Sequence, residues 1–156
     1  MSARGKTIAM TVAGLGAGML LLFWAFVEAA GGHGDYAVFA VASLPGLALA
    51  CLGDPIAMVS MFALPPAQWA FLAFCAGRCV FEKKPAWAKG LVWTGFIYLA
   101  VAAIWLTMDG FHHGFSPVNS VSAAGLCTGA FLVVAGLILR KPVALKPPPA
   151  NPNDGA

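Results

Sequence analysis

Charged side chains are scarce in this chain. Only 10% of its 156 residues are Asp, Glu, Lys or Arg, whereas an ordinary soluble domain has about 25%. Most of the remainder is apolar, because 60% of the residues are hydrophobic. This composition excludes most water-soluble folds.

Long polar stretches are also missing. Uncharged residues run without interruption over 7–27, 36–53, 55–77, 90–108 and 110–139. A helix needs about 20 mainly apolar residues to cross a hydrocarbon core about 30 Å thick. We therefore predict an all-α fold: a polytopic transmembrane bundle of four to five hydrophobic helices, with a single integral membrane domain over 1–140. No room is left for a soluble catalytic domain.

Motifs of known chemistry are absent too. The sequence contains no Walker phosphate loop, no dinucleotide-binding glycine pattern, no HExxH helix and no nucleophile elbow. Enzyme activity is therefore not indicated, although a membrane enzyme acting on lipid or on a thiol partner stays a third class of function. The net charge of +3 comes from residues that flank hydrophobic segments, so membrane lipid is the expected partner and nucleic acid is not.

Glycine, by contrast, is plentiful, with 18 residues. Gly14 and Gly18 form a GxxxG pair in the first segment, 7–29, and Gly125 and Gly129 form another near the end of the chain, in 119–139. Such pairs let two membrane helices approach closely. We predict helix-packing faces at both pairs. The alternative is chance, since glycine is frequent in membrane helices.

The first hydrophobic segment has two interpretations. Arg4 and Lys6 precede it, and Val27-Glu28-Ala29 resembles a cleavage site, as in a secretory signal. However, the segment is longer than the apolar region of about 7 to 15 residues found in such signals. We expect it to be retained as the first span.

Prolines interrupt the middle of the sequence. Pro45-Gly46 falls inside the segment 36–53, and Pro65-Pro66 falls inside the next one. Helices broken in this way are buried in protein or line a cavity. We predict that 36–81 is proline-broken, with kinked or re-entrant helices. An ordinary kink and a cavity wall are both consistent with the pattern.

Several polar residues fall inside the predicted spans, and we expect them to bond between helices. They are Ser43, Ser60, Gln68, Thr94, Tyr98 and Asn119.

The basic residues favour a four-crossing topology. Four crossings with the N-terminus inside place all nine Lys and Arg residues on the cytoplasmic side, as the positive-inside rule requires. Five crossings with the N-terminus outside leave Arg4 and Lys6 on the wrong side. In the four-crossing topology 36–81 crosses once and part of it dips in and returns. The proline-rich tail, 141–156, is then a disordered cytoplasmic appendage.

With four crossings, two loops rich in imidazole and carboxylate share the non-cytoplasmic side. Both groups suit Zn²⁺, Cu²⁺ or Ni²⁺, and histidine can also handle protons near neutral pH. The alternative is a set of exposed turn residues with no ligand. We expect no cofactor, and a divalent metal is the alternative, at a rim formed by His33, Asp35, Asp109, His112 and His113, next to Glu28.

Cys75 and Cys79 form a possible thiol pair, because a spacing of four puts both on one helical face near Arg78. Two thiols make half of a tetrahedral metal site. The alternative is packing, since cysteine behaves as a small apolar residue and redox pairs usually have two intervening residues.

Two functions are consistent with these features. The first is a non-catalytic accessory, assembly or scaffold subunit of the bacterial inner membrane, packing through its Gly-rich faces on itself or on a larger complex. The second is transport or handling of a small solute or metal ion, with the histidine-carboxylate rim as its entry. The sequence specifies no substrate, partner or oligomeric state.

Overall fold

The computed structural model describes residues 1–30, 37–50, 53–113 and 120–141, and nearly all of them are helical. No strand occurs among them, so the predicted all-α fold is confirmed. The elements are α1 (Ala3–Ala30), α2 (Ala37–Ala50), α3 (Asp54–Val80), the 3-10 helix η1 (Pro85–Trp87), α4 (Ala88–His113) and α5 (Ser120–Arg140).

Four of the described helices are long and apolar enough to cross a membrane, and the chain is an integral membrane protein. The candidate spans are Ala3–Glu28, Val59–Val80, Pro85–Met108 and Val121–Arg140. Helix α2 has 14 residues and is therefore about 21 Å long, too short to cross a hydrocarbon core of about 30 Å.

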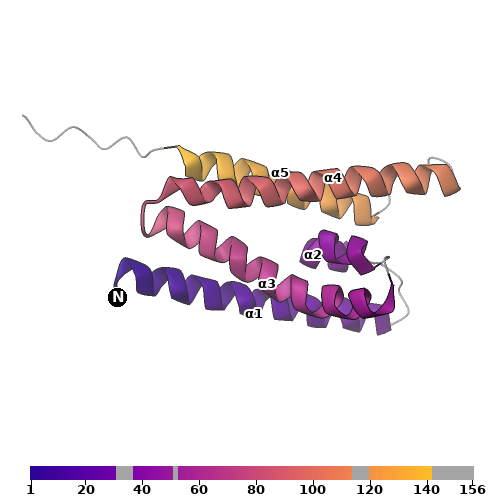
Figure 1. Ribbon diagram of the computed structural model, residues 1–156, viewed down its shortest axis with the longest axis horizontal. Coiled ribbons are helices and arrows are strands. Elements are labelled where there is room, and N and C mark those ends of the chain that lie inside the picture. The colour runs from indigo at the N-terminus through magenta and orange to yellow at the C-terminus, as the bar shows by residue number, and fades with distance from the viewer. Residues whose placement is uncertain (31–36, 51–52, 114–119, 142–156) are drawn as a thin grey trace, which may run out of the picture.

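The four long helices form two pairs. Helix α1 packs along α3, and α4 packs along α5 (Figure 1). Helix α2 lies between the pairs, at the end far from the N-terminus, and contacts all four long helices. Because the described parts of α1 touch neither α4 nor α5, α2 helps to join the pairs.

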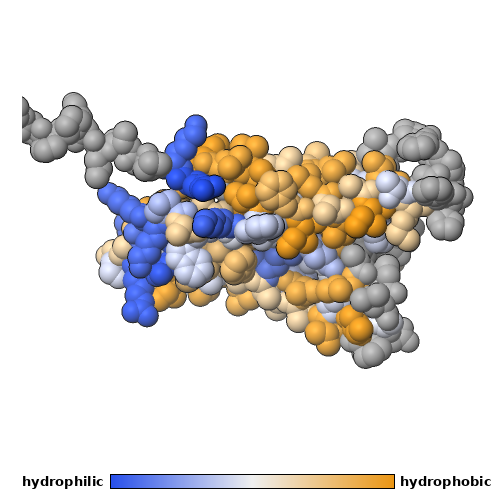
Figure 2. Space-filling model, turned by 45° about the horizontal axis from the view of Figure 1, so that its top comes forward, coloured by the Kyte–Doolittle hydropathy of each residue, from blue (hydrophilic) through white to orange (hydrophobic). Residues whose placement is uncertain are grey.

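The basic residues lie at one end of the helical bundle. The N-terminus, the α3–α4 connection and the end of α5 lie together at one end of the molecule (Figure 1). Figure 2 shows hydrophilic residues gathered at this end and hydrophobic residues over most of the rest. We call it the basic end. Its described basic residues are Arg4, Lys6, Arg78, Lys83, Lys84, Lys89, Arg140 and Lys141. This is the arrangement that the four-crossing topology predicts.

The proline-broken middle is shorter than predicted. Helix α3 continues through Pro65 and Pro66, and within the described helices non-helical backbone angles are found at Ser43 in α2 (φ −165°, ψ 86°). The loop predicted to hold Asp109, His112 and His113 is helical instead, because α4 continues as far as His113. The single Gly110 does not stop the helix, and the next proline is Pro117.

Both glycine pairs lie against helices of the same chain. A Cβ atom on Gly14 would collide with Ala73 and lie 2.6 Å from the Trp69 carbonyl oxygen. A Cβ atom on Gly18 would lie 2.6 Å from Pro66 Cα. The α1 pair therefore packs on α3.

The α5 pair is covered in the same way. A Cβ atom on Gly125 would lie 2.6 Å from Leu44 Cδ2 of α2, and one on Gly129 would lie 2.9 Å from the Gly95 carbonyl oxygen of α4. The α5 pair therefore packs on α2 and α4 of the same chain.

Candidate functional site

Helix α2 is broken at Ser43, and the break leaves two backbone carbonyls without helical partners. Pro45 has no N–H to donate to the Val41 carbonyl, its partner in a regular helix. The Gly46 N–H donates instead to Ser43 Oγ, at 3.2 Å, so the Ala42 carbonyl also loses its usual donor. Ser43 thus caps the second half of α2.

Side chains from two other helices supply the missing donors. The Tyr98 hydroxyl of α4 donates to the Val41 carbonyl at 3.2 Å. The indole N–H of Trp69 in α3 donates to the Ala42 carbonyl at 3.0 Å. Each carbonyl released by the break is therefore satisfied by a neighbouring helix.

Gln68 connects these contacts into one network. Ser43 Oγ donates to Gln68 Oε1 at 3.1 Å, and Gln68 Nε2 donates to Tyr98 Oη at 2.6 Å. The predicted bonding between helices is thus confirmed for these three residues, whereas Thr94 donates to Gly90 of its own helix. We call this network the α2 joint. It comprises Val41, Ala42, Ser43, Gln68, Trp69 and Tyr98.

The joint reaches into the apolar interior, where Ser43 and Tyr98 are buried, while Gln68 and Trp69 are half-buried. Tyr98 is 0% exposed and Ser43 is 3% exposed, and Ala40, Leu44 and Ala102 are fully buried around them. In such surroundings an unsatisfied polar group costs several kcal/mol. The groups of the joint bond to one another across three helices, so its geometry fits the packing of these helices.

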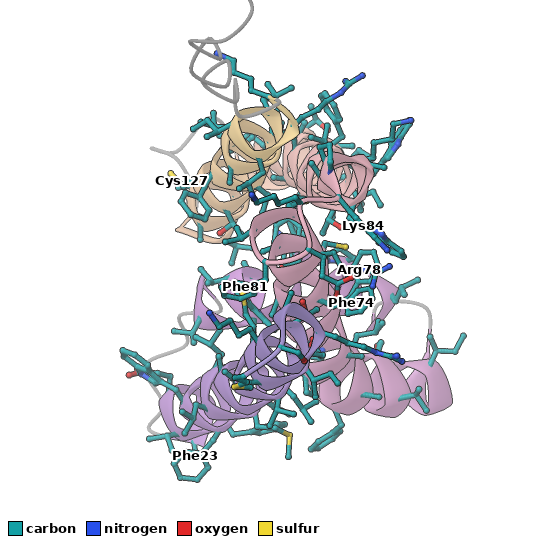
Figure 3. All side chains as sticks on the ribbon, turned by 90° about the vertical axis from the view of Figure 1, so that its left-hand side faces the viewer. Phe23, Phe74, Arg78, Phe81, Lys84 and Cys127 are labelled. Carbon is teal, nitrogen blue, oxygen red and sulfur yellow. The ribbon has the colours of Figure 1, made fainter. Side chains whose placement is uncertain are left out.

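A second polar cluster lies at the basic end. Arg78 pairs with Glu82 one turn later, and its guanidinium carbon lies 5.6 Å from the centre of the Phe74 ring and 5.4 Å from that of Trp87. Both distances are in the range of cation–π contacts. Figure 3, which looks onto the basic end, shows Lys84, Arg78 and Phe74 close together on one side of the molecule.

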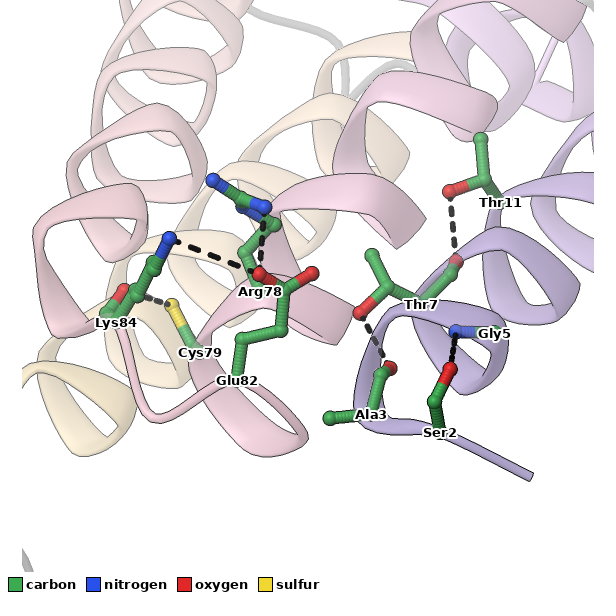
Figure 4. Close-up of polar contacts among 9 residues, drawn as sticks. All are labelled: Ser2, Ala3, Gly5, Thr7, Thr11, Arg78, Cys79, Glu82 and Lys84. Carbon is green, nitrogen blue, oxygen red and sulfur yellow. Dashed lines mark hydrogen bonds and ion pairs between the residues drawn. The ribbon is translucent and has the colours of Figure 1, made fainter.

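The connection after α3 folds back over this cluster. Lys83 has a left-handed backbone (φ 52°), and the Lys84 N–H donates to the Arg78 carbonyl at 3.0 Å. This turn brings Lys84 Nζ to 3.8 Å from Glu82 Oε2, so the carboxylate lies between two cations (Figure 4).

Glu82 is kept ionised by these neighbours. Partial desolvation alone would raise the pKa of its carboxyl group, but the side chains of Arg78 and Thr7 and the charge of Lys84 outweigh it. The net result is a pKa below the ordinary value of 4.5.

The two predicted thiols have different surroundings. Cys75 is buried, and a Cβ atom on Gly90 of α4 would lie 2.7 Å from its Sγ. The Sγ atom of Cys79 lies 3.6 Å from the Lys84 carbonyl oxygen. Both are free cysteines; Cys75 is in a packing contact, and the Cys79 thiol donates a hydrogen bond to the Lys84 carbonyl.

The predicted metal rim stays a prediction. His33 and Asp35 lie outside the described residues, as do the side chains of Asp109, His112 and His113. Among the side chains that the structure describes, no three metal-binding groups lie together.

No protein-family model, curated protein or solved structure matches this chain. Its function is therefore inferred from its own geometry.

Proposed function

We propose that this chain is a non-catalytic accessory or assembly subunit of a larger complex in the bacterial inner membrane, crossing the membrane four times. The observation that carries the proposal is the α2 joint. Its polar side chains, buried Ser43 and Tyr98 and half-buried Gln68, bond to one another and to the backbone. Polar groups arranged in this way hold helices together and are not aimed at a substrate.

The proposed orientation has the basic end in the cytoplasm, as the positive-inside rule requires. It is tested with single reporter cysteines at His33, Lys84 and His112 in a variant without the native cysteines. We expect an impermeant thiol reagent outside intact cells to label positions 33 and 112 but not 84. Labelling of 84 together with 33 would contradict the four-crossing topology.

The surface proposed for a partner is the outer face of α1. Both glycine pairs are covered within the chain, and α1 is the least buried of the four spans. Gly16 faces away from α3, with no atom within 4 Å of a Cβ placed there, and Val12, Leu20 and Phe23 are exposed nearby. A small residue among large apolar ones gives a partner helix a place to approach.

The test is the native size of the chain in mild detergent at its natural expression level. We expect the wild-type chain to migrate with a larger complex. Gly16→Leu should release it, because the added side chain fills the open face without touching the chain's own helices. Ala130→Leu, on the exposed side of α5, is the matched control and should leave the complex intact. A strictly monomeric wild-type chain would contradict the proposal.

A second candidate, the handling of a divalent metal, is favoured by one observation. Helices α1 and α4 end on the same side of the molecule, opposite the basic end (Figure 1), as a shared rim of His33, His112 and His113 requires. We expect saturable zinc binding that weakens at low pH and is lost when all three become Ala. Unchanged binding in that triple variant would exclude this function.

A further inference from the structure

One face of α3 changes from aromatic to basic as it approaches the basic end. Phe71, Phe74 and Arg78 follow each other at i, i+3 and i+7, so they form a stripe along one side of the helix, and Glu82 follows just beyond its end, paired with Arg78. At a rise of about 1.5 Å per residue, Phe71 lies about 10 Å deeper in the membrane than Arg78. We call these four residues, together with Lys84 of the following turn, the α3 stripe.

The stripe is accessible from the lipid. The Phe71 ring lies close to Gly90 of α4: a Cβ atom placed on Gly90 would be 3.2 Å from the ring. The other side of the ring is free, because Phe71 is 44% exposed. Trp87, which meets Phe74 edge to face with 5.1 Å between the ring centres, is 37% exposed. Phe71 therefore presents apolar surface at hydrocarbon depth, and Trp87 presents apolar surface beside Arg78.

The basic part of the stripe offers accessible cations in a fixed position. The side chain of Arg78 is 22% exposed and that of Lys84 is 55% exposed. Glu82 and the rings of Phe74 and Trp87 hold the guanidinium in place. Glu82 neutralises only one of the two charges, so the cluster keeps a net positive charge.

We propose that the α3 stripe binds one anionic phospholipid of the surrounding bilayer. An acyl chain lies along Phe71 and Phe74, and the phosphate contacts Arg78 and Lys84. The apolar rings and the cations are in the order in which a lipid presents its chain and its phosphate. Guanidinium groups are well suited to phosphate oxygens, and basic residues at the membrane surface attract anionic lipids. This proposal does not depend on the accessory function.

The test is native mass spectrometry of the full chain after equilibration in equal amounts of phosphatidylglycerol and phosphatidylcholine. We expect one phosphatidylglycerol to be retained in preference. Lys84→Gln and Arg78→Gln should each lower that preference about fivefold, the effect of one basic residue at a membrane surface. Arg140→Gln, which removes a charge from the same end on α5, is the control and should not change it.

Three results would overturn the proposal. One is equal retention of the two lipids by the wild-type chain. Another is a loss in Arg140→Gln as large as in Lys84→Gln, which would indicate only the general charge of the basic end. The third is loss of the preference in millimolar inorganic phosphate at constant ionic strength, which would indicate an anion site without lipid specificity. Lys84 is exposed, so its variant keeps the test decisive even if Arg78→Gln does not fold.

Discussion

Removing one oxygen atom, in Tyr98→Phe, tests the role of the α2 joint. The Tyr98 hydroxyl accepts from Gln68 Nε2 and donates to the Val41 carbonyl. Phenylalanine keeps the ring and its packing but makes neither bond. The Val41 carbonyl then has no replacement donor, because the residue four positions later is Pro45.

The expected loss of stability can be worked out from these two bonds. Hydrogen bonds between side chains of membrane helices contribute about 0.6 kcal/mol on average and about 1.7 kcal/mol at most. Two such bonds give about 1 to 3 kcal/mol, which is also the range for leaving a buried polar group unsatisfied. We expect Tyr98→Phe to lower the free energy of unfolding by this amount.

The measurement is equilibrium unfolding in mixed micelles, with increasing dodecyl sulfate and circular dichroism as the signal. Thr94→Val is the matched control, because Thr94 lies one turn earlier on α4 and donates only within its own helix. Its effect should stay within about 0.5 kcal/mol. Gln68→Leu combined with Tyr98→Phe should cost less than the sum of the two single changes, because they share a bond. The reasoning is refuted if Tyr98→Phe is no more destabilising than Thr94→Val.

Three further predictions use the same unfolding measurement. Gly14→Ala should cost about 1 to 3 kcal/mol because its Cβ would meet the α3 backbone, whereas Gly16→Ala, which meets nothing, should be neutral; equal effects would contradict the packing. Ser43→Ala should cost about 0.5 to 2 kcal/mol through loss of the α2 cap, and no loss would mean that the cap is unimportant. The pKa of Glu82 is lowered in the folded state, so the unfolded state binds more protons in acid. Stability should therefore fall as the pH drops through 4.5 towards the folded pKa; the fall should be smaller in Glu82→Gln, and an unchanged profile would exclude this contribution.

The spans could be predicted from the sequence because charged residues interrupt it at the membrane surfaces. Arg4 and Lys6 lie at the start of α1, and Arg140 ends α5. The loop predicted around Asp109 and His112 is helical in the structure. Polar residues such as these resemble a turn in composition. They lack a strong stop signal before Gly114, so the helix continues to His113.

The α2 joint could be predicted only in part. Ser43, Gln68 and Tyr98 stand out as polar residues within apolar segments, but their partners depend on how the helices rotate against one another, which composition does not specify. Trp69 could be found only by counting backbone hydrogen bonds. The break at Ser43 and Pro45 implies that backbone carbonyls in the preceding turn need new hydrogen-bond donors. An indole N–H within a membrane span, such as that of Trp69, needs an acceptor.

The break in α2 also determines how this helix can be stable. A regular helix satisfies its own backbone in lipid, but α2 exposes the carbonyls of Val41 and Ala42, and each would cost several kcal/mol without a donor. Its position therefore depends on α3 and α4, which carry Trp69 and Tyr98, whereas the four long helices can insert independently. Hydrogen exchange in Tyr98→Phe should accordingly rise more in α2 than in α4 around position 98. An equal rise of hydrogen exchange in α2 and α4 would mean that the joint stabilises the whole bundle and not the position of α2 in particular.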